Sequence, residues 1–359
     1  MSGVWGNNIK VSIFGESHGV GIGITIDGLP SGIELDLEEI ELEMARRAPG
    51  KSSLSTARKE GDKVEILSGF FEGKTTGTPL CGIIRNSDMR SKDYGKLKDV
   101  MRPGHADYSG HMRYDGFNDY RGGGHFSGRI TAPLVFAGSI AKQILEKQGI
   151  YIAAHVSSIG TIKDNSFKDN TLTLDELKEL RLKELPLLNE ALEDEMRNYI
   201  LEAKKDGDSV GGKIECTVVG MNAGLGNPFF DSVESSLAHL LFSVPAVKGV
   251  EFGLGFNMTE MRGSECNDEY YYEEDRVLAR TNNNGGIIGG ITNGMPILFT
   301  VGIKPTPSIS KEQNTIDVGD KVNTTLKVEG RHDPCIVQRA LPVIEAVTAI
   351  GILDLVKER

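Results

Sequence analysis

Residues 9–27, IKVSIFGESHGVGIGITID, contain two short apolar strands joined by a polar turn. The strands are expected at 9–14 and 22–27, where β-branched residues are frequent and glycines mark the boundaries. A second pair of neighbouring strands is expected at 63–68 and 80–85, again with turn residues between them. Such neighbours favour antiparallel sheets, so a doubly wound parallel sheet is not expected.

Helices are expected where apolar residues recur every three or four positions. Asp36 and Glu39 form a capping-box pattern before a helix that ends near Pro49. Residues 132–148 carry a long apolar face and are followed by Gly149, a common helix terminator. The remaining predicted helices lie at 174–185, 187–205, 232–243 and 335–356. The remaining predicted strands lie at 213–219, 296–303 and 324–329.

We expect one domain over residues 1–359. The most polar stretch, 161–209, separates two more apolar halves at about 1–150 and 210–359. Each half contains the pattern G-x-T-x-G-x-P, as GKTTGTP at 73–79 and GITNGMP at 290–296, and an apolar strand follows each. The match raises the hypothesis of a duplicated β-rich unit.

The composition excludes several classes of function. The net charge of −11 and the isoelectric point near 5.3 argue against nonspecific binding to nucleic acid or to a membrane surface. No apolar run approaches the roughly 20 residues of a membrane span, and the N-terminus does not resemble a signal peptide. The four cysteines are scattered without zinc spacing, which predicts reduced thiols in a cytoplasmic protein and no metal site.

One segment gathers cationic and titratable groups within this acidic chain. Residues 102–129, RPGHADYSGHMRYDGFNDYRGGGHFSGR, hold three histidines, four arginines and three consecutive glycines. A Pro-Gly turn precedes His105, and Ser127 and Arg129 follow the glycines, whose backbone N–H groups can approach an anion or a planar ring. Three further segments show similar chemistry: GESHG at 15–19 with His18, KPTPS at 304–308, and GRHDPC at 330–335 with Arg331 and Asp333.

These segments together resemble chorismate synthase. The resemblance also includes RR-x-PG at 46–50, EILSGFFEGKTTGTP at 65–79, AVKGVEFG at 246–253 and NNGGIIGGITNG at 283–294. It extends from residue 9 to beyond 345 and preserves the order and spacing of the motifs. It implies an α+β fold in which antiparallel β-sheets sandwich α-helices, and a homotetramer.

The resemblance also implies an activity. Chorismate synthases catalyse the last step of the shikimate pathway, a 1,4-anti elimination of phosphate and a C6 hydrogen from 5-enolpyruvylshikimate 3-phosphate. They require reduced FMN. The short chain resembles the monofunctional members, so we expect an external flavin reductase rather than reduction of the flavin by the protein itself with NADPH.

Site residues follow from the matching positions. His18 would protonate the departing phosphate, His105 would stand by the flavin, and Asp333 would assist proton removal at flavin N5. The flavin would be bound by His125, Phe126, Ser127, Pro245, Ala246, Gly289, Lys304, Pro305, Thr306, Pro307, Ser308, Arg331 and Arg47. The substrate anions would be bound by Arg47, Lys51, Arg102, Arg129 and Arg331. Arg47 and Lys51 lie in the segment that the family links with a nicotinamide nucleotide or with substrate anions.

The chain departs from the family pattern at three of these positions. Family members usually have RGGGRSSAR where this chain has RGGGHFSGR, so His125 and Phe126 replace an arginine and a serine. Pro307 replaces a serine in KPTSS and removes a hydroxyl and an N–H donor. Two alternatives to the enzyme remain at this stage: a metal-dependent phosphohydrolase built from the His and Asp residues, and a non-catalytic flavin-binding protein.

Overall fold

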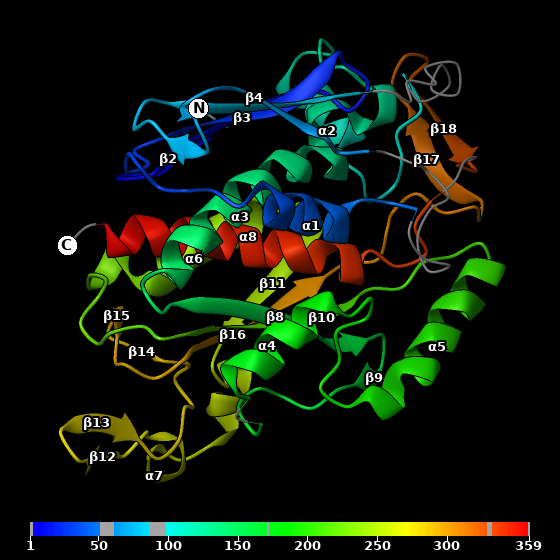
Figure 1. The fold of residues 1–359 in the computed structure, drawn as a ribbon. Coiled ribbons are helices and arrows are strands. Elements are labelled where there is room, and N and C mark those ends of the chain that lie inside the picture. The colour runs from blue at the N-terminus through cyan, green and yellow to red at the C-terminus, as the bar shows by residue number, and fades with distance from the viewer. Residues whose placement is uncertain (1–2, 51–60, 87–97, 171, 329–331, 358–359) are drawn as a thin grey trace.

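The computed structural model describes residues 3–50, 61–86, 98–170, 172–328 and 332–357. Two antiparallel sheets lie on either side of a layer of helices (Figure 1). This arrangement confirms the α+β sandwich that the resemblance implied.

The first sheet contains the strands expected from the N-terminal quarter of the sequence. Its order is β1 (Val4–Trp5), β2 (Lys10–Gly15), β3 (Gly21–Asp27), β7 (Leu80–Arg85) and β4 (Val64–Ser68). Neighbouring strands pair antiparallel, with Ser12 opposite Thr25 in the β2–β3 hairpin. The four strands predicted in this region are therefore confirmed. A two-stranded unit, β5 (Phe70–Phe71) and β6 (Lys74–Thr75), precedes β7.

The second sheet lies on the other side of the helices (Figure 1). Its order is β11 (Val247–Phe252), β16 (Ile297–Ile303), β10 (Gly212–Val219), β8 (Tyr151–Ile159) and β9 (Ile162–Lys163). The sequence predicted β10 and β16 but not β8 or β11. The remaining strands form hairpins: β12 (Tyr270–Glu273) with β13 (Arg276–Ala279), β14 (Ile287–Ile288) with β15 (Ile291–Thr292), and β17 (Gln313–Asp317) with β18 (Val322–Leu326).

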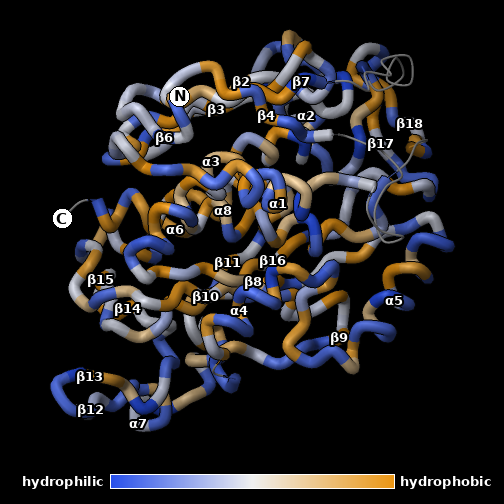
Figure 2. Tube along the Cα trace, viewed as in Figure 1, coloured by the Kyte–Doolittle hydropathy of each residue, from blue (hydrophilic) through white to orange (hydrophobic). Residues whose placement is uncertain are grey.

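The middle layer is the apolar centre of the molecule (Figure 2). It consists of α1 (Leu37–Arg47), α3 (Thr131–Glu146), α6 (Val233–Ser243) and α8 (Val337–Val356). The helices α3 and α8 pack closely, because a Cβ on Gly138 would overlap Ala346. Each fully buried Leu or Ile in such a layer stabilises the fold by about 1.5–3 kcal/mol.

The other helices are short or lie outside this layer. The helices α4 (Leu174–Leu182) and α5 (Glu193–Lys205) pack against the face of β8 away from α8 (Figure 1). The short helices are α2 (Asp107–Arg113) and α7 (Gly263–Cys266), with 3₁₀ turns at η2 (Arg121–Phe126), η3 (Gly128–Ile130), η4 (Glu190–Leu192), η5 (Phe229–Asp231) and η6 (Gly255–Glu260).

The start of α1 and the end of α3 lie close to the predicted positions. Asp36 caps α1 by accepting hydrogen bonds from the backbone N–H groups of Glu38 and Glu39. The reciprocal bond of a capping box is replaced, because the Asp36 N–H donates to Gln143 Oε1 at 2.8 Å. Gly149 has φ of 78° after α3, which confirms it as the terminating residue.

Two further expectations concern chemistry outside the site. All four cysteines are free, as the scattered spacing predicted. Burial raises the pKa of Cys335 to about 12, so this thiol is inert near neutral pH. Within the described ranges, no helix is both long and apolar enough to cross a membrane.

Candidate functional site

Four loops from distant parts of the sequence meet beside the first sheet. The Ser17 N–H donates to the Gly124 carbonyl at 3.1 Å, Arg102 Nη1 donates to Ser308 Oγ at 3.4 Å, and Lys304 Nζ contacts the Gly104 carbonyl. We call this region the loop cluster; it consists of residues 15–19, 102–107, 121–129 and 304–308. The contacts bring together the GESHG, RPGHADY, RGGG and KPTPS motifs.

The three glycines of the RGGG motif separate two histidines. Gly122, Gly123 and Gly124 all have positive φ values of 59°, 85° and 53°, a region that side chains other than glycine disfavour. A Cβ on Gly122 would overlap the His18 ring, and a Cβ on Gly123 would lie 3.0 Å from His105 Cε1. The glycines therefore allow two imidazoles to approach the same short piece of backbone.

His105 is held by a carboxylate on one side. Its Nδ1 lies 2.6 Å from Asp107 Oδ1, whereas Arg102 Nη2 lies 3.2 Å from the same nitrogen. Because a carboxylate only accepts, Nδ1–H donates to Asp107 and Nε2 faces Gly123. Burial would raise the pKa of Asp107, but hydrogen bonds from Arg102 and His105 hold it well below its usual range. The Asp107 carboxylate therefore stays ionised at neutral pH and fixes the ring.

A second group of residues lies beside η3 and contains two of the predicted arginines. The Nε and Nη2 atoms of Arg47 donate to Asp62 Oδ2 at 3.2 and 3.0 Å, and Arg129 Nη1 donates to Asp62 Oδ1. Arg47 Nη1 donates to the Gly128 carbonyl and to Thr131 Oγ1. Both arginines and Asp62 are buried.

Asn86 connects this second group to the loop that carries His18. Its Oδ1 accepts from Arg129 Nε at 3.2 Å, and its Nδ2 donates to the carbonyls of Glu16 and Gly19 at 3.0 and 2.9 Å. Nδ1 of His125 lies 2.8 Å from the Gly15 carbonyl, so Nδ1–H donates there. The GESHG loop is thus fixed from two sides.

Phe126, which departs from the family pattern, and the retained Ser127 both have structural contacts in this chain. Phe126 packs against Gly110, whose Cβ would lie 2.6 Å from its ring, and its centroid is 6.2 Å from that of Tyr114. Ser127 Oγ accepts from the Arg129 N–H at 3.3 Å and begins η3. Phe126 therefore anchors α2 and Ser127 orients the start of the turn that carries Arg129.

The KPTPS loop contributes a cation and a buried hydroxyl. The Lys304 N–H donates to the Ala246 carbonyl at 2.9 Å, which brings Pro245 and Ala246 to this loop. Burial, and then the charge of Lys248, lowers the pKa of Lys304. Within the described part of the chain, the buried Thr306 Oγ1 has no hydrogen-bond partner. A buried hydroxyl of this kind is suited to form a hydrogen bond with a ligand.

Asp333 is also held in place. It does not cap α8; instead it accepts from Arg339 Nη1 at 2.5 Å, and Arg339 Nε donates to the Arg47 carbonyl at 3.1 Å. This arrangement connects Asp333 with the Arg47 group.

Gly289 lies away from the KPTPS loop within this chain. Gly289 follows β14, and its neighbour Gly290 accepts from Val233 at the start of α6, whereas Ala246 follows the end of α6. Gly289 and the KPTPS loop are thus near opposite ends of a helix about 16 Å long. Lys51 and Arg331 lie outside the described residues.

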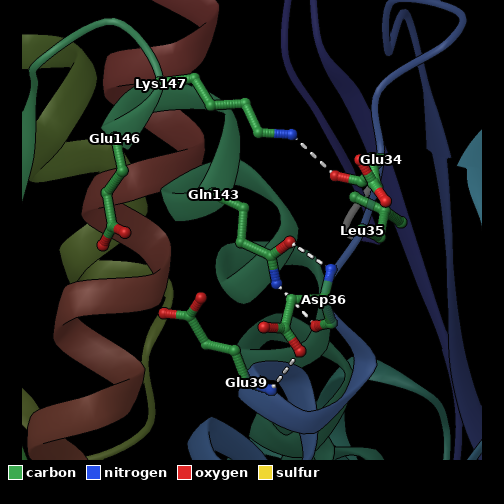
Figure 3. Close-up of a pocket in the computed structure, with 7 residues that line it drawn as sticks. All are labelled: Glu34, Leu35, Asp36, Glu39, Gln143, Glu146 and Lys147. Carbon is green, nitrogen blue, oxygen red and sulfur yellow. Dashed lines mark hydrogen bonds between the residues drawn. The ribbon is translucent and has the colours of Figure 1, made fainter.

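A cavity of about 540 Å³ lies elsewhere, between the start of α1 and the end of α3 (Figure 3). Its lining is dominated by carboxylates: Glu34, Asp36, Glu39 and Glu146, with Leu35, Gln143 and Lys147. An anionic ligand would be repelled there, so the cavity does not compete with the loop cluster as an anion site. Across the described ranges, no group of three or more His, Cys, Asp or Glu side chains could hold a metal ion.

Comparisons with known proteins agree with one another. A family model described as chorismate synthase matches residues 9–356. The chain is 47% identical to the chorismate synthase of Methanocaldococcus jannaschii, with 99% of this chain and 96% of that protein covered. It is also 47% identical to that of Pyrococcus abyssi, with 97% and 96% covered.

A solved structure gives the same result. The crystal structure of a chorismate synthase superposes with a TM-score of 0.79 at 31% sequence identity. The superposition covers 99% of this chain and 93% of that chain.

Proposed function

The chain belongs to the chorismate synthase family, and from this premise we propose that it converts 5-enolpyruvylshikimate 3-phosphate into chorismate with reduced FMN as cofactor. Membership makes the chain a lyase and sets aside both alternatives, the phosphohydrolase and the non-catalytic flavin-binding protein. The proposed reaction is a 1,4-anti elimination of phosphate and a C6 hydrogen.

The observation that carries the proposal is the pair of imidazoles on either side of Gly122 and Gly123. A departing phosphate needs a proton or a cation to take up its developing charge. The imidazole of His18 is suited to donate that proton, because histidine titrates near neutral pH. His105, with Nδ1–H fixed on Asp107, keeps Nε2 for a second proton transfer.

The cations around the loop cluster suit the substrate. It carries two carboxylates and a phosphate, and two opposite charges 4 Å apart attract by about 4 kcal/mol at an effective dielectric of about 20. We propose that Arg102, Arg129 and Lys304 supply this attraction. Arg47 belongs to the same group of charges, and Lys51 and Arg331 are proposed as further ligands from the family pattern.

The leaving hydrogen explains the need for a cofactor. The C6 carbon is poorly acidic, so an ordinary side-chain base does not remove the hydrogen easily. When bound, reduced FMN supplies electron density as phosphate leaves and recovers it afterwards.

Several residues of the chain fit this cofactor. The buried Thr306 Oγ1 and the Lys304 ammonium are suited to its polar groups. The same role is proposed for His125, Phe126, Ser127, Pro245, Ala246, Pro305, Pro307, Ser308 and Arg331. Asp333, fixed by Arg339, would accept a proton beside it.

One assay tests the proposed function. The purified protein is incubated anaerobically with 5-enolpyruvylshikimate 3-phosphate, with reduced FMN, with oxidised FMN and without flavin, and chorismate is measured. Product is expected only with reduced FMN. An absence of product with reduced FMN would refute the proposal, and product without flavin would refute the cofactor assignment.

The reductant and the assembly are separate parts of the proposal. We expect no NADPH oxidation by the protein with oxidised FMN, because an external reductase is proposed to supply reduced flavin. A homotetramer is expected, with a mass of about four times 39.0 kDa in sedimentation. NADPH oxidation at the rate of chorismate formation would identify a protein that reduces its own flavin.

A further inference from the structure

Asp62 lies between two arginines and contacts both. Its Oδ2 accepts from Arg47 and its Oδ1 from Arg129, and its side chain is 2% exposed. Two guanidinium groups this close repel each other strongly in a buried environment. A single carboxylate between them cancels much of that repulsion and fixes the orientation of both planes.

The backbone at Asp62 shows that this position is specified by its surroundings. Asp62 has φ of 37°, which is uncommon for a residue other than glycine. Such conformations cost about 1–3 kcal/mol and persist where neighbouring contacts over-determine them. The two arginines hold the Asp62 side chain in this position.

Both arginines have further contacts besides Asp62. All three side-chain nitrogens of Arg47 donate to protein groups: Asp62, the Gly128 carbonyl and Thr131. Arg129 is held at Nη1 by Asp62 and at Nε by Asn86. Asn86 also donates to the carbonyls on either side of the Ser17–His18 pair.

We propose that Asp62 and Asn86 are positioning residues that fix the guanidinium of Arg129 for a substrate anion, and that Arg47 braces Asp62. The inference rests on the proposed function. Asn86 also sets the distance between Arg129 and the loop that carries His18, so anion binding and proton donation depend on one amide.

Two variants test the proposal in the holoenzyme with reduced FMN. Asp62→Asn keeps the shape but removes the charge, and Asn86→Ala releases Nε of Arg129. Each is expected to raise KM for 5-enolpyruvylshikimate 3-phosphate on the order of 10- to 100-fold, the effect of a small misplacement of a binding group. The Kd for FMN is expected to stay within about 2-fold of the wild type, which separates the effect from general loosening.

A matched control distinguishes positioning from stability. Glu215, in the second sheet, is a buried carboxylate that likewise accepts from two side chains, His155 and Ser166. Glu215→Gln is expected to lower Tm and to leave KM unchanged. Unchanged KM in both Asp62→Asn and Asn86→Ala would overturn the inference, provided that the wild type turns over.

A double-mutant cycle gives a second readout. If Asp62 acts through Arg129, Arg129→Ala and Arg129→Ala/Asp62→Asn have the same KM within about 2-fold. Additive effects would overturn the proposal. If Asp62→Asn does not fold, Asn86→Ala decides the question, because Asn86 is only half-buried. A wild type that forms no chorismate would instead refute the proposed function.

Discussion

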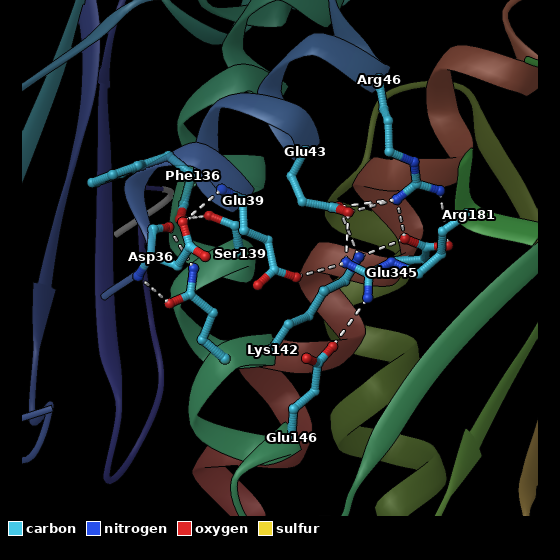
Figure 4. Close-up of polar contacts among 11 residues, drawn as sticks. Asp36, Glu39, Glu43, Arg46, Phe136, Ser139, Lys142, Glu146, Arg181 and Glu345 are labelled. Carbon is cyan, nitrogen blue, oxygen red and sulfur yellow. Dashed lines mark hydrogen bonds and ion pairs between the residues drawn. The ribbon is translucent and has the colours of Figure 1, made fainter. Parts of the chain in front are cut away.

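A buried charge network lies between the helices of the middle layer and includes Glu43 and Glu345 (Figure 4). Glu345 Oε2 accepts from Lys142 Nζ at 2.5 Å and from Arg46 Nη1 at 2.6 Å, and Oε1 accepts from the Ala154 N–H. Its side chain is fully buried. Burial would raise its pKa, but Arg46 and Lys142 lower it, so the carboxylate is ionised at neutral pH.

The substitution Glu345→Gln removes this charge and keeps the shape. Arg46, Lys142 and Arg181 then share one fully buried carboxylate, Glu43, instead of two. Breaking a buried pair by removing one partner costs about 3–5 kcal/mol, because it leaves a buried charge uncompensated. An unfolding entropy of about 2.1 cal/mol/K per residue gives about 0.75 kcal/mol/K for a chain of this length. The expected fall in Tm is therefore about 4–7 °C.

Thermal unfolding at neutral pH, followed by calorimetry, measures this change. The control is Glu190→Gln, because Glu190 also accepts from a lysine at 2.5 Å but is 68% exposed. Its Tm is expected to match the wild type, since exposed ion pairs contribute little. Equal Tm values for Glu345→Gln and Glu190→Gln would refute the reasoning that burial makes this network matter.

The pH dependence of the free energy of unfolding is an independent test. Because the folded pKa of Glu345 is depressed, its contribution is present above the unfolded value, about 4.3, and is lost as pH falls through the folded value. Glu345→Gln is therefore expected to lose less stability than the wild type between about pH 5 and pH 3. Identical acid slopes would contradict the assignment.

Two further predictions concern histidines. His105→Ala is expected to lower kcat by about 10²- to 10⁴-fold with Tm unchanged. The control is His239→Ala, at an exposed position on α6, which is expected to turn over normally. Near-normal turnover of His105→Ala would contradict the role of His105. Burial alone would lower the pKa of His155, but hydrogen bonds to Asp164 and Glu215 raise this pKa above its ordinary value. The protonated ring therefore stabilises the fold below about pH 6.5, and this stabilisation is lost as pH rises through the pKa of the folded state. His155→Gln is expected to flatten the fall in the free energy of unfolding above about pH 6.5, and equal slopes would refute the charge assignment.

Apolar patterning predicted several elements of the core with close boundaries. The strands at 9–14 and 22–27 and the helix at 132–148 correspond to β2, β3 and α3 within two residues. The strand β8 was missed because α8 packs on one face of it and α4 and α5 pack on the other. A strand covered on both faces has no alternation of polar and apolar residues.

The sequence predicted the motifs of the site but not all the residues that hold these motifs in position. The glycines of RGGG were expected to approach a ligand, and in the structure they also approach His18 and His105. Asp62 and Asn86 were missed because each lies in a polar stretch without a motif of its own, and only the fold places it beside Arg129. Asp107 lies within RPGHADY, so the signal for it was present.

The repeated pattern G-x-T-x-G-x-P has the same structure in both halves. Thr75 Oγ1 donates to the Pro30 carbonyl and accepts from the Ile33 N–H, and Thr292 Oγ1 donates to the Asn222 carbonyl and accepts from the Leu225 N–H. In each case the residue whose N–H donates lies three residues after the residue whose carbonyl accepts, and both follow a strand of a five-stranded sheet.

We propose that the two sheets descend from one duplicated unit, because their strands also follow the same order. The order β2-β3-β7-β4 corresponds to β8-β10-β16-β11, and α1 and α3 correspond to α6 and α8. The second copy then begins at β8, and the polar segment with α4 and α5 occupies the position of the GESHG turn. One copy keeps a tight turn that presents His18 to the site, while the other uses the same connection to cover the outside of its sheet. The two copies thus share one arrangement of strands and helices, and the site is asymmetric because this connecting segment differs between them.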